Sequence, residues 1–319
     1  MSSIIPANVR SFIDAYEGQT PHLVVSLDVV KAKYSSLVKA MPKARHHYAM
    51  KANPDPDLLK MLSGLGCYFE CASIQEIDLC ITAGAAVKDI LYGNPLKKVS
   101  EIRAAYERGI EQYVFDAEME LEKIIEHAPG SKVLCRIKTD GHGAVSPLSI
   151  KFGCPSDRAI QWLQKAAVHG LTPHGISFHT GSQQLDPASW RDPIAKAADI
   201  FRTLASVAGI NTMEVLDVGG GFPVDYRKSV TSIAKFGEAI NTFVAEYFSE
   251  MSSLPLVYTE PGRFLPGDAG FIISEVVLIS PSATNPDTRW VYLDIGKYGG
   301  LVESDIDYPI LTVNNQMVM

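Results

Sequence analysis

The clearest sign of the architecture is the stretch Val215-Leu-Asp-Val-Gly-Gly-Gly221, in which a short β-rich run leads directly into three glycines. A helical pattern follows at Ile233–Met251. A β-rich run, a loop and an amphipathic helix together form one βα unit, the repeating element of a parallel sheet. If this unit belongs to such a sheet, the same alternation should recur along the chain.

The alternation occurs eight times in all. The expected strands are His46–Met50, Cys67–Cys71, Asp89–Tyr92, Gln112–Phe115, Lys132–Ile137, Gly175–Phe178, Glu214–Val218 and Leu256–Thr259. The expected helices are Asp55–Leu65, Ile74–Ala83, Val99–Arg108, Ala117–His127, Asp157–His169, Pro187–Ala208 and Ile233–Met251. Eight βα units over about 220 residues are what a (β/α)8 barrel requires, so we expect an α/β protein built on a TIM barrel.

Two pieces lie outside the barrel pattern. Before it come a helical Val9–Tyr16, an extended Leu23–Leu27 and a helical Val29–Ala40. After it come two longer strands, Phe271–Ile279 and Trp290–Asp294, which indicate an antiparallel β domain that needs more strands to close its edge. The predicted organisation is an N-terminal segment that packs on the β domain (1–26), the barrel (27–265) and an incomplete second β domain (266–319).

The charge balance argues for a small-molecule partner. The 319 residues include 29 Lys+Arg and 36 Asp+Glu, and the net charge is -7. Because affinity for a phosphate backbone depends on clustered Lys and Arg, we expect no nucleic-acid partner. The hydrophobic share of 46% is enough for a large core, which excludes a disordered chain.

The sequence indicates neither a targeting segment nor a metal site. Residues Met1–Pro6 lack a signal-peptide pattern, and no apolar run approaches the roughly 20 residues that span a bilayer, so we expect a cytoplasmic protein with no membrane partner. The cysteines form no CxxC pair and have no His at zinc-finger spacing, so we expect reduced thiols and no metal. These cysteines are Cys67, Cys71, Cys80, Cys135 and Cys154.

Polar residues or glycines stand where most of the expected strands end. In a (β/α)8 barrel the catalytic groups lie at the carboxyl ends of the strands, so these positions are the candidates for chemistry. In chain order they are Lys51, Glu70, Asn94, Arg136, His179, Gly219-Gly220-Gly221 and Glu260. We expect them to surround one barrel mouth.

Lys51 is the candidate nucleophile. It follows the apolar strand end Tyr-Ala-Met, where desolvation would lower the pKa of its amine and free it to attack an aldehyde. Taken alone, a lysine after a strand is more often a solvated surface residue. The motifs that follow favour the chemical role.

The triplet Gly219–Gly221 offers backbone N–H groups that no side chain obstructs, which suits a phosphate dianion. It matches neither GxGxxG nor GxxxxGK[ST], so a cofactor with one phosphate is favoured over NAD or ATP. Glu260, Gly262 and Arg263 follow the last strand in a Glu-Pro-Gly-Arg segment, which brings an acid to the barrel mouth and an arginine within reach of the same phosphate. The alternative for this segment is an ordinary type I or II turn.

His179 adds an imidazole to the set, although a histidine at a strand end is more often a hydrogen-bonded structural residue. The hydrolase elbow GxSxG and the zinc motif HExxH are both absent from the sequence. An amine, a phosphate cradle, a carboxylate and an imidazole around one barrel mouth are what a pyridoxal 5'-phosphate site needs.

Five motifs carry a resemblance to a known family. They are Tyr48-Ala-Met-Lys-Ala-Asn53, Phe69-Glu-Cys-Ala-Ser73, Ser177-Phe-His-Thr-Gly-Ser182, Leu216-Asp-Val-Gly-Gly-Gly-Phe-Pro223 and Glu260-Pro-Gly-Arg263. In this order they resemble the motifs of the alanine-racemase-fold amino acid decarboxylases, which include ornithine, lysine, arginine and diaminopimelate decarboxylases. Two more segments, Gly143–Gly153 and Val291–Gly300, resemble the bacterial ornithine and lysine/ornithine enzymes most.

The resemblance implies a role for each candidate. Lys51 would hold pyridoxal 5'-phosphate through its amine, Glu260 would keep the pyridine nitrogen protonated, and His179 would stack on the ring. These three are the implied catalytic residues. The implied phosphate ligands are Ser182, Gly219, Gly220, Gly221, Gly262 and Arg263, and the implied pocket-lining residues are Glu70 and Arg136.

The resemblance also implies a substrate. Asp294 would face the distal ammonium of a diamino acid, where an unpaired buried charge would be costly, and Tyr298 of the same segment would lie beside it. The alternative is that Asp294 only caps the turn before Gly296. The implied reaction turns L-ornithine into putrescine for polyamine biosynthesis, or L-lysine into cadaverine, in a homodimer whose subunits share the active site.

The resemblance is incomplete near the end of the sequence. Relatives continue past the motif Tyr308-Pro-Ile310 into a region with a Cys-Asp pair, whose thiol protonates the product, and a tyrosine that contacts the cofactor. None of the cysteines here follows Glu260, so we expect slow or misdirected protonation. Two alternatives stay open: an impaired relative or regulatory pseudoenzyme that binds the cofactor, and a diaminopimelate decarboxylase or amino acid racemase.

Overall fold

The structure is a computed structural model that describes residues 5–146, 151–226, 229–301 and 308–312. The chain divides into two compact units. The larger comprises Lys31–Val224 and Val230–Leu265, and the smaller comprises Met1–Val30, Asp225–Ser229 and Pro266–Met319.

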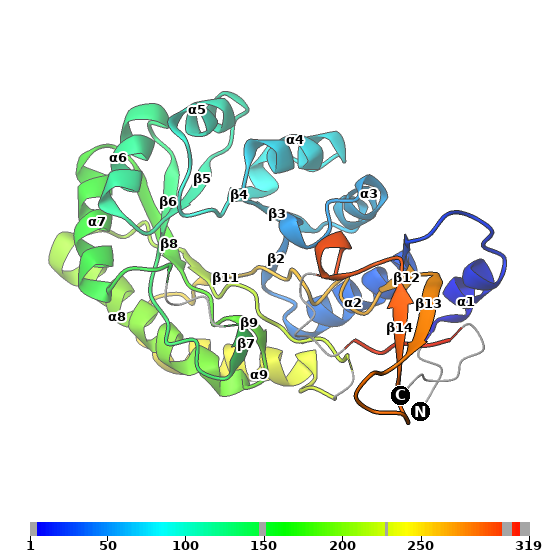
Figure 1. The fold of residues 1–319 in the computed structure, drawn as a ribbon. Helices are drawn as coiled ribbons and strands as arrows, with labels where there is room; N and C mark the ends of the chain where they lie inside the picture. The colour runs from blue at the N-terminus through cyan, green and yellow to red at the C-terminus, as the bar shows by residue number, and fades with distance from the viewer. Residues whose placement is uncertain (1–4, 147–150, 227–228, 302–307, 313–319) are drawn as a thin grey trace. The chain divides into compact units, whose positions relative to one another are not determined.

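Eight parallel strands close into a barrel in the larger unit (Figure 1). Around the barrel they are β10 (Val215–Asp217), β11 (Leu256–Thr259), β2 (Arg45–Ala49), β3 (Tyr68–Cys71), β4 (Ile90–Tyr92), β5 (Gln112–Phe115), β6 (Lys132–Arg136) and β8 (Thr172–Ser177). Strand β11 pairs with β2, with Thr259 opposite His46, and this contact closes the ring. The predicted (β/α)8 barrel is confirmed, because each of the eight expected strands overlaps one of these.

Helices alternate with the barrel strands and lie on the outside of the barrel (Figure 1). They are α2 (Leu27–Ala40), α3 (Pro56–Gly64), α4 (Ile74–Thr82), α5 (Val99–Glu107), α6 (Glu118–His127), α7 (Ser156–Val168), α8 (Arg191–Ala208) and α9 (Ile233–Tyr247), with short 3-10 turns at Met50–Ala52, Val87–Asp89 and Pro187–Trp190. Capping residues mark their ends: the Asp55 carboxylate accepts two backbone N–H groups at the start of α3. Helix α8 ends at Gly209, whose φ of 65° suits glycine.

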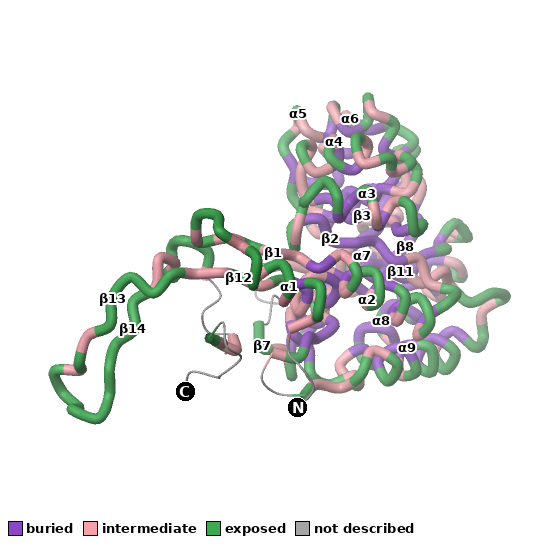
Figure 2. The backbone as a smooth tube through the Cα atoms, turned by 90° about the vertical axis from the view of Figure 1, so that its right-hand side faces the viewer, coloured by how far each residue is buried: buried purple, intermediate pink, exposed green. Residues whose placement is uncertain are grey.

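The barrel interior is filled by side chains and is the centre of the core. Leu91, Val114, Leu134, Val215 and Tyr258 come from five different strands and form one cluster in which each residue is at most 1% exposed. Figure 2 shows the buried backbone concentrated in these strands. Since burying a large aliphatic side chain stabilises a fold by about 1.5–3 kcal/mol, this cluster holds the strand ends in a rigid frame.

The smaller unit contains two antiparallel strand pairs. Strand β1 (His22–Val25) pairs with β12 (Gly270–Ile273), and β13 (Val276–Pro281) pairs with β14 (Arg289–Leu293). The helix α1 (Ala7–Asp14) and a 3-10 turn at Lys297–Gly299 complete its regular elements among the described residues.

The prediction of one long strand over Phe271–Ile279 is wrong. The chain bends at Ser274 and Glu275, so that β12 and β13 pair with different partners. The carboxylate of Asp294 stabilises the bend, because it accepts hydrogen bonds from Ser274 Oγ at 2.6 Å and from the Glu275 N–H at 3.0 Å. Ser274 and Glu275 are polar, but two polar residues between the apolar runs Phe271–Ile273 and Val276–Ile279 are too few to mark a loop, so the sequence did not indicate the interruption.

A short antiparallel pair lies among the loops that follow the barrel strands. Strand β7 (Ala144–Ser146) pairs with β9 (Ser182–Gln184), and neither was expected from the sequence. Their residues are mostly small and polar, without the alternating apolar pattern that identifies a strand. No helix in the described part of the chain is both long and apolar enough to cross a bilayer. The five cysteines are buried and free of disulfides.

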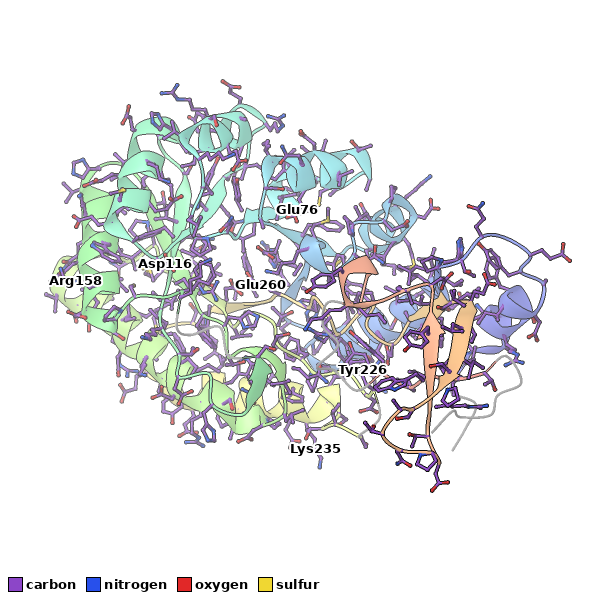
Figure 3. All side chains as sticks on the ribbon, in the orientation of Figure 1. Glu76, Asp116, Arg158, Tyr226, Lys235 and Glu260 are labelled. Carbon is purple, nitrogen blue, oxygen red and sulfur yellow. The ribbon has the colours of Figure 1, made fainter. Side chains whose placement is uncertain are left out.

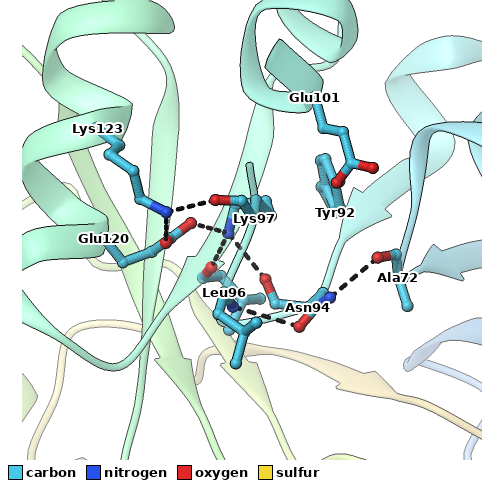
Figure 4. A network of polar contacts seen from close by, with 9 residues as sticks. Ala72, Tyr92, Asn94, Leu96, Lys97, Glu101, Glu120 and Lys123 are labelled. Atoms are coloured by element: carbon cyan, nitrogen blue, oxygen red, sulfur yellow. Dashed lines mark hydrogen bonds and ion pairs between the residues drawn. The ribbon is translucent and has the colours of Figure 1, made fainter. Parts of the chain in front are cut away.

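A buried lysine ties together the elements around β4 and β5 (Figure 4). The Nζ atom of Lys97 donates to the backbone oxygens of Asn94 at 2.8 Å and Val114 at 2.7 Å, and it pairs with Glu120 Oε1 at 3.0 Å. Glu120 also pairs with Lys123. Burial lowers the pKa of Lys97 to about 8, although the Glu120 carboxylate opposes the shift.

The network predicts that Glu120→Leu destabilises the protein strongly. The substitution removes the acid that pairs with both lysines and leaves the buried ammonium of Lys97 with only the weaker influence of Asp116. We expect the free energy of unfolding, measured by urea denaturation, to fall by about 3–5 kcal/mol. The control Lys123→Met keeps the buried pair of Lys97 and Glu120, so it should lower the free energy of unfolding much less. Equal losses in the two variants would contradict this account.

Candidate active site

The barrel brings Lys51 and Glu70 together at the carboxyl ends of β2 and β3. Lys51 lies in the 3-10 turn directly after β2, and its side chain is 67% exposed. Glu70 belongs to β3, and its side chain is only 4% exposed. The Lys51 Nζ atom lies 3.8 Å from Glu70 Oε2, so a buried carboxylate faces an accessible amine.

The expected lowering of the pKa of Lys51 is wrong. The Glu70 carboxylate raises the pKa of the Lys51 amine, and this effect exceeds the opposing effect of desolvation. Glu260 also raises it, whereas the guanidinium of Arg136 lowers it. The amine is therefore held as an ammonium by neighbouring acids until the charges at this site change.

Arg136 and His179 form the next part of the site. Arg136 ends β6, and its guanidinium lies 5.1 Å from the centre of the Phe152 ring. The Nδ1 atom of His179 accepts a hydrogen bond from the Gly181 N–H at 2.9 Å, so a neutral ring carries its proton on Nε2. Burial lowers the pKa of His179 to about 3, and the cations of Arg136 and Lys51 add to the shift. The imidazole is therefore a neutral, flat surface at physiological pH.

Two carboxyl groups share a proton where β10 and β11 end. Asp217 is fully buried and accepts hydrogen bonds from Ser177 Oγ at 2.9 Å and from the Gly219 N–H at 3.0 Å. Its carboxyl group is also hydrogen-bonded to Glu260, which is labelled in Figure 3. Burial raises the pKa of Asp217 to about 6 and, together with the charge of Asp217, raises the pKa of Glu260 well above its usual range. The shared proton therefore lies mainly on Glu260.

The glycine triplet forms a cradle that side chains would fill. A Cβ atom on Gly220 would lie 2.2 Å from the Glu260 backbone oxygen, and one on Gly221 would lie 2.2 Å from the Gly181 backbone oxygen. Gly219 and Gly221 also have positive φ values of 68° and 96°. Only glycine satisfies both conditions at this place.

Further groups suited to a phosphate lie on the adjoining loops. Arg263 Nε donates to Ser182 Oγ at 3.5 Å, and the Gln184 N–H donates to the Gly221 oxygen at 2.8 Å. The hydroxyl of Thr180 is buried and has no hydrogen-bond partner among the residues that the structure describes. A Cβ atom on Gly262 would meet its nearest neighbour at 3.4 Å, so the structure does not require glycine there for space.

These residues fit pyridoxal 5'-phosphate. The cradle, the Thr180 hydroxyl without a partner and the cation of Arg263 suit an anion with several acceptor oxygens. The Lys51 amine suits an aldehyde, and the protonated Glu260 suits a ring nitrogen. Among the described residues no group of three His, Cys, Asp or Glu side chains is arranged to hold a metal ion.

The two predicted substrate residues belong to the smaller unit. Asp294 is engaged by Ser274 and Glu275, and these hydrogen bonds, with one from Thr20, lower the pKa of its carboxyl. Tyr298 is 98% exposed. Within the larger unit the structure brings together the cofactor candidates, whereas the substrate roles of Asp294 and Tyr298 stay predictions.

Sequence reasoning missed Asp217 and Thr180 as parts of the site. Asp217 was visible as an acid inside the apolar run Val-Leu-Asp-Val, a pattern that usually marks a buried carboxylate with specific partners. Thr180 gave no such signal, because a threonine in a loop is ordinary.

The shared proton predicts how Asp217→Asn changes the pH dependence of stability. The pKa of Asp217 is about 6 in the folded protein against its ordinary 3.8, so between these values the folded state holds a proton that the unfolded chain lacks. The wild-type fold therefore loses this contribution, about 1–3 kcal/mol, as the pH rises through that range. Asparagine does not titrate, so the stability of the variant relative to wild type should increase from pH 4 to pH 7.

Urea denaturation at several pH values measures this difference. The buried histidines titrate in both proteins and cancel in the comparison. Two stability curves that run parallel from pH 4 to pH 7 would rule out the shared proton.

Comparison with known proteins shows the family of this chain. A family model described as the pyridoxal binding domain of pyridoxal-dependent decarboxylases matches residues 27–267. Lysine/ornithine decarboxylase of Selenomonas ruminantium is 35% identical over 295 residues, which are 91% of this chain and 73% of that protein. Antizyme inhibitor 2 of Xenopus laevis is 32% identical over 89% of this chain and 63% of its own length. The chain thus spans between 63% and 73% of these two relatives.

A solved structure gives the same result. Lysine/ornithine decarboxylase of Vibrio vulnificus, crystallised with putrescine, superposes with a TM-score of 0.86 at 29% identity and covers 97% of this chain and 82% of its own. The predicted family resemblance and the predicted cofactor are confirmed. With its pyridoxal binding domain folded as a closed barrel, the chain belongs to the pyridoxal-dependent decarboxylases of basic amino acids.

Proposed function

We propose that this protein is a carboxy-lyase that uses pyridoxal 5'-phosphate to decarboxylate a basic amino acid. The preferred reaction would turn L-ornithine into putrescine, and the alternative reaction would turn L-lysine into cadaverine. The observation that carries the proposal is the accessible Lys51 amine opposite the buried Glu70, at the same barrel mouth as the glycine cradle. The names of the Selenomonas and Vibrio relatives support this substrate class.

The cofactor supplies a ring that accepts the electron pair left when the carboxylate of the substrate departs as CO2. Lys51 would hold the cofactor through its amine. The backbone N–H groups of Gly220, Gly221 and Gly262, with the side chains of Ser182 and Arg263, would hold its phosphate. The Gly219 N–H already donates to Asp217, so Gly219 would contribute only the shape of the turn. Glu70 and Arg136 line the pocket beside Lys51.

Glu260 and His179 prepare the ring for this chemistry. Glu260 carries a proton because its carboxyl lies against Asp217, and it can place that proton on the pyridine nitrogen. A protonated nitrogen makes the ring a stronger electron acceptor. His179 is neutral, so its flat face can pack on the ring without adding a second positive charge.

The remaining assignments rest on the resemblance of this chain to its family. Asp294 would pair with the distal ammonium of the substrate, and Tyr298 would lie beside it. Ornithine and lysine differ by one methylene, which a pocket distinguishes by only about 1–3 kcal/mol, so activity on both is expected. A homodimer in the cytoplasm is the proposed state of the protein.

An assay of CO2 release from L-ornithine, L-lysine and meso-diaminopimelate tests the function. We expect release from ornithine and, more slowly, from lysine, and no release by Lys51→Ala. Release from diaminopimelate alone would replace the proposed substrate. Cofactor binding without CO2 release from any of the three would instead support a non-catalytic role, as in a relative named antizyme inhibitor 2.

The phosphate cradle predicts a selective effect of Arg263→Gln. Loss of a charged hydrogen-bond donor should weaken binding of pyridoxal 5'-phosphate about 10- to 100-fold, because such bonds contribute about 1.5–3 kcal/mol. Binding of pyridoxal, which has no phosphate, should change little. Absorbance titration measures both affinities, and Arg158→Gln, an exposed arginine on α7, is the control. Equal weakening for both ligands would place Arg263 away from the phosphate.

A further inference from the structure

We propose that Gly93 is a positioning residue for the active site: the absence of a side chain at this position is what allows the Glu70 carboxylate to lie opposite Lys51. Gly93 directly follows β4, and its N–H donates to the Cys71 oxygen at 3.0 Å. It therefore lies beside the end of β3, where Glu70 is located.

The contact between Gly93 and Glu70 is steric. A Cβ atom on Gly93 would lie 2.4 Å from Glu70 Oε1, 2.6 Å from Cγ and 2.8 Å from Cδ. Atoms that are not bonded do not approach this closely, so the carboxylate occupies the space of the missing side chain. The φ angle of Gly93 is outside the left-handed range that favours glycine. Backbone conformation therefore does not require glycine here, and the space does.

The position of Glu70 depends on such confinement because few polar contacts hold it. Its side chain is 4% exposed, and within the described part of the chain its Oε2 atom has no hydrogen-bond partner. The cation that faces it is Lys51, at 3.8 Å. Burying a carboxylate with so few polar partners costs free energy. The shape of the surrounding pocket therefore decides how near the Glu70 carboxylate stays to the Lys51 amine.

The charged groups around Lys51 show what a movement of Glu70 would change. Glu70, Glu260 and Glu76 favour the ammonium, whereas Arg136 disfavours it and His179 is neutral. Glu70 has the largest influence of these groups. If its carboxylate leaves the space beside Gly93, the amine of Lys51 becomes neutral more readily.

Acetylation of Lys51 by acetic anhydride tests the proposal in the protein without cofactor. The reagent attacks only the neutral amine, and Lys51 is accessible to it at 67% exposure. Peptide mass spectrometry gives the rate at Lys51 at pH 9, with exposed Lys60 as an internal reference. The functional importance of Gly93 rests on the proposed function, in which Lys51 holds the cofactor. The acetylation rate, however, needs neither cofactor nor turnover. The proposal for Gly93 can therefore fail while the proposed function stands, and the reverse.

We expect Gly93→Ala to lower the pKa of Lys51 and so to speed its acetylation about three- to tenfold, because a fall of one pKa unit raises the neutral fraction of the amine tenfold. The Glu70→Gln variant, which lacks the carboxylate, gives the upper limit of this rate. Glu70 is a flexible side chain that can move, so the variant should fold, which its melting temperature checks. A double variant with Glu70→Asp and Gly93→Ala has a shorter acid beside the added methyl group. Its rate of acetylation at Lys51 should therefore lie nearer the wild-type rate than that of Gly93→Ala alone.

The matched control is Gly64→Ala, at the end of α3, where a Cβ atom would meet nothing within 4 Å. Its rate should equal that of wild type. A folded Gly93→Ala variant with the wild-type rate at Lys51, or a double variant whose effect is the sum of the single effects, would overturn the proposal.

Discussion

Three backbone segments meet at the glycine triplet more closely than any side chain would permit, and the arrangement of the site depends on this contact. A Cβ atom on Gly219 would lie 2.3 Å from the Phe178 oxygen, and those on Gly220 and Gly221 would lie equally close to the loops after β11 and β8. The loops after β8, β10 and β11 are therefore locked together. His179 and Glu260, which belong to two of these loops, are held in place by the same contact.

The site also concentrates charge in a space that the barrel partly shields from water. The cations of Lys51 and Arg136 stand among the acids Glu70, Glu76, Asp217 and Glu260. Burial makes each charge sensitive to its neighbours, so the protonation state of one group depends on the others. Lys51 is therefore kept as an ammonium despite its partial desolvation, and Glu260 holds a proton more readily than a carboxyl group in water would.

The barrel and the strand-end residues could be predicted because parallel strands impose a common pattern. Most of the strands are largely apolar and are followed by a polar residue or a glycine, and closure of the ring brings their ends to one mouth. The pKa of Lys51 could not be predicted, since it depends on Glu70, 3.8 Å away but on a different strand. The bend at Ser274 and the pairing of β7 with β9 depend likewise on hydrogen bonds between segments distant in sequence. Gly93 carried no signal, because its importance lies in one neighbouring side chain.

The proposed function depends on the amine of Lys51 as the attachment point for the cofactor. Incubation with pyridoxal 5'-phosphate, reduction with borohydride and mapping of the modified peptide identify the lysine that holds it. We expect one stoichiometric adduct, located at Lys51. An adduct on another lysine, or a protein that stays colourless and unmodified, would contradict it.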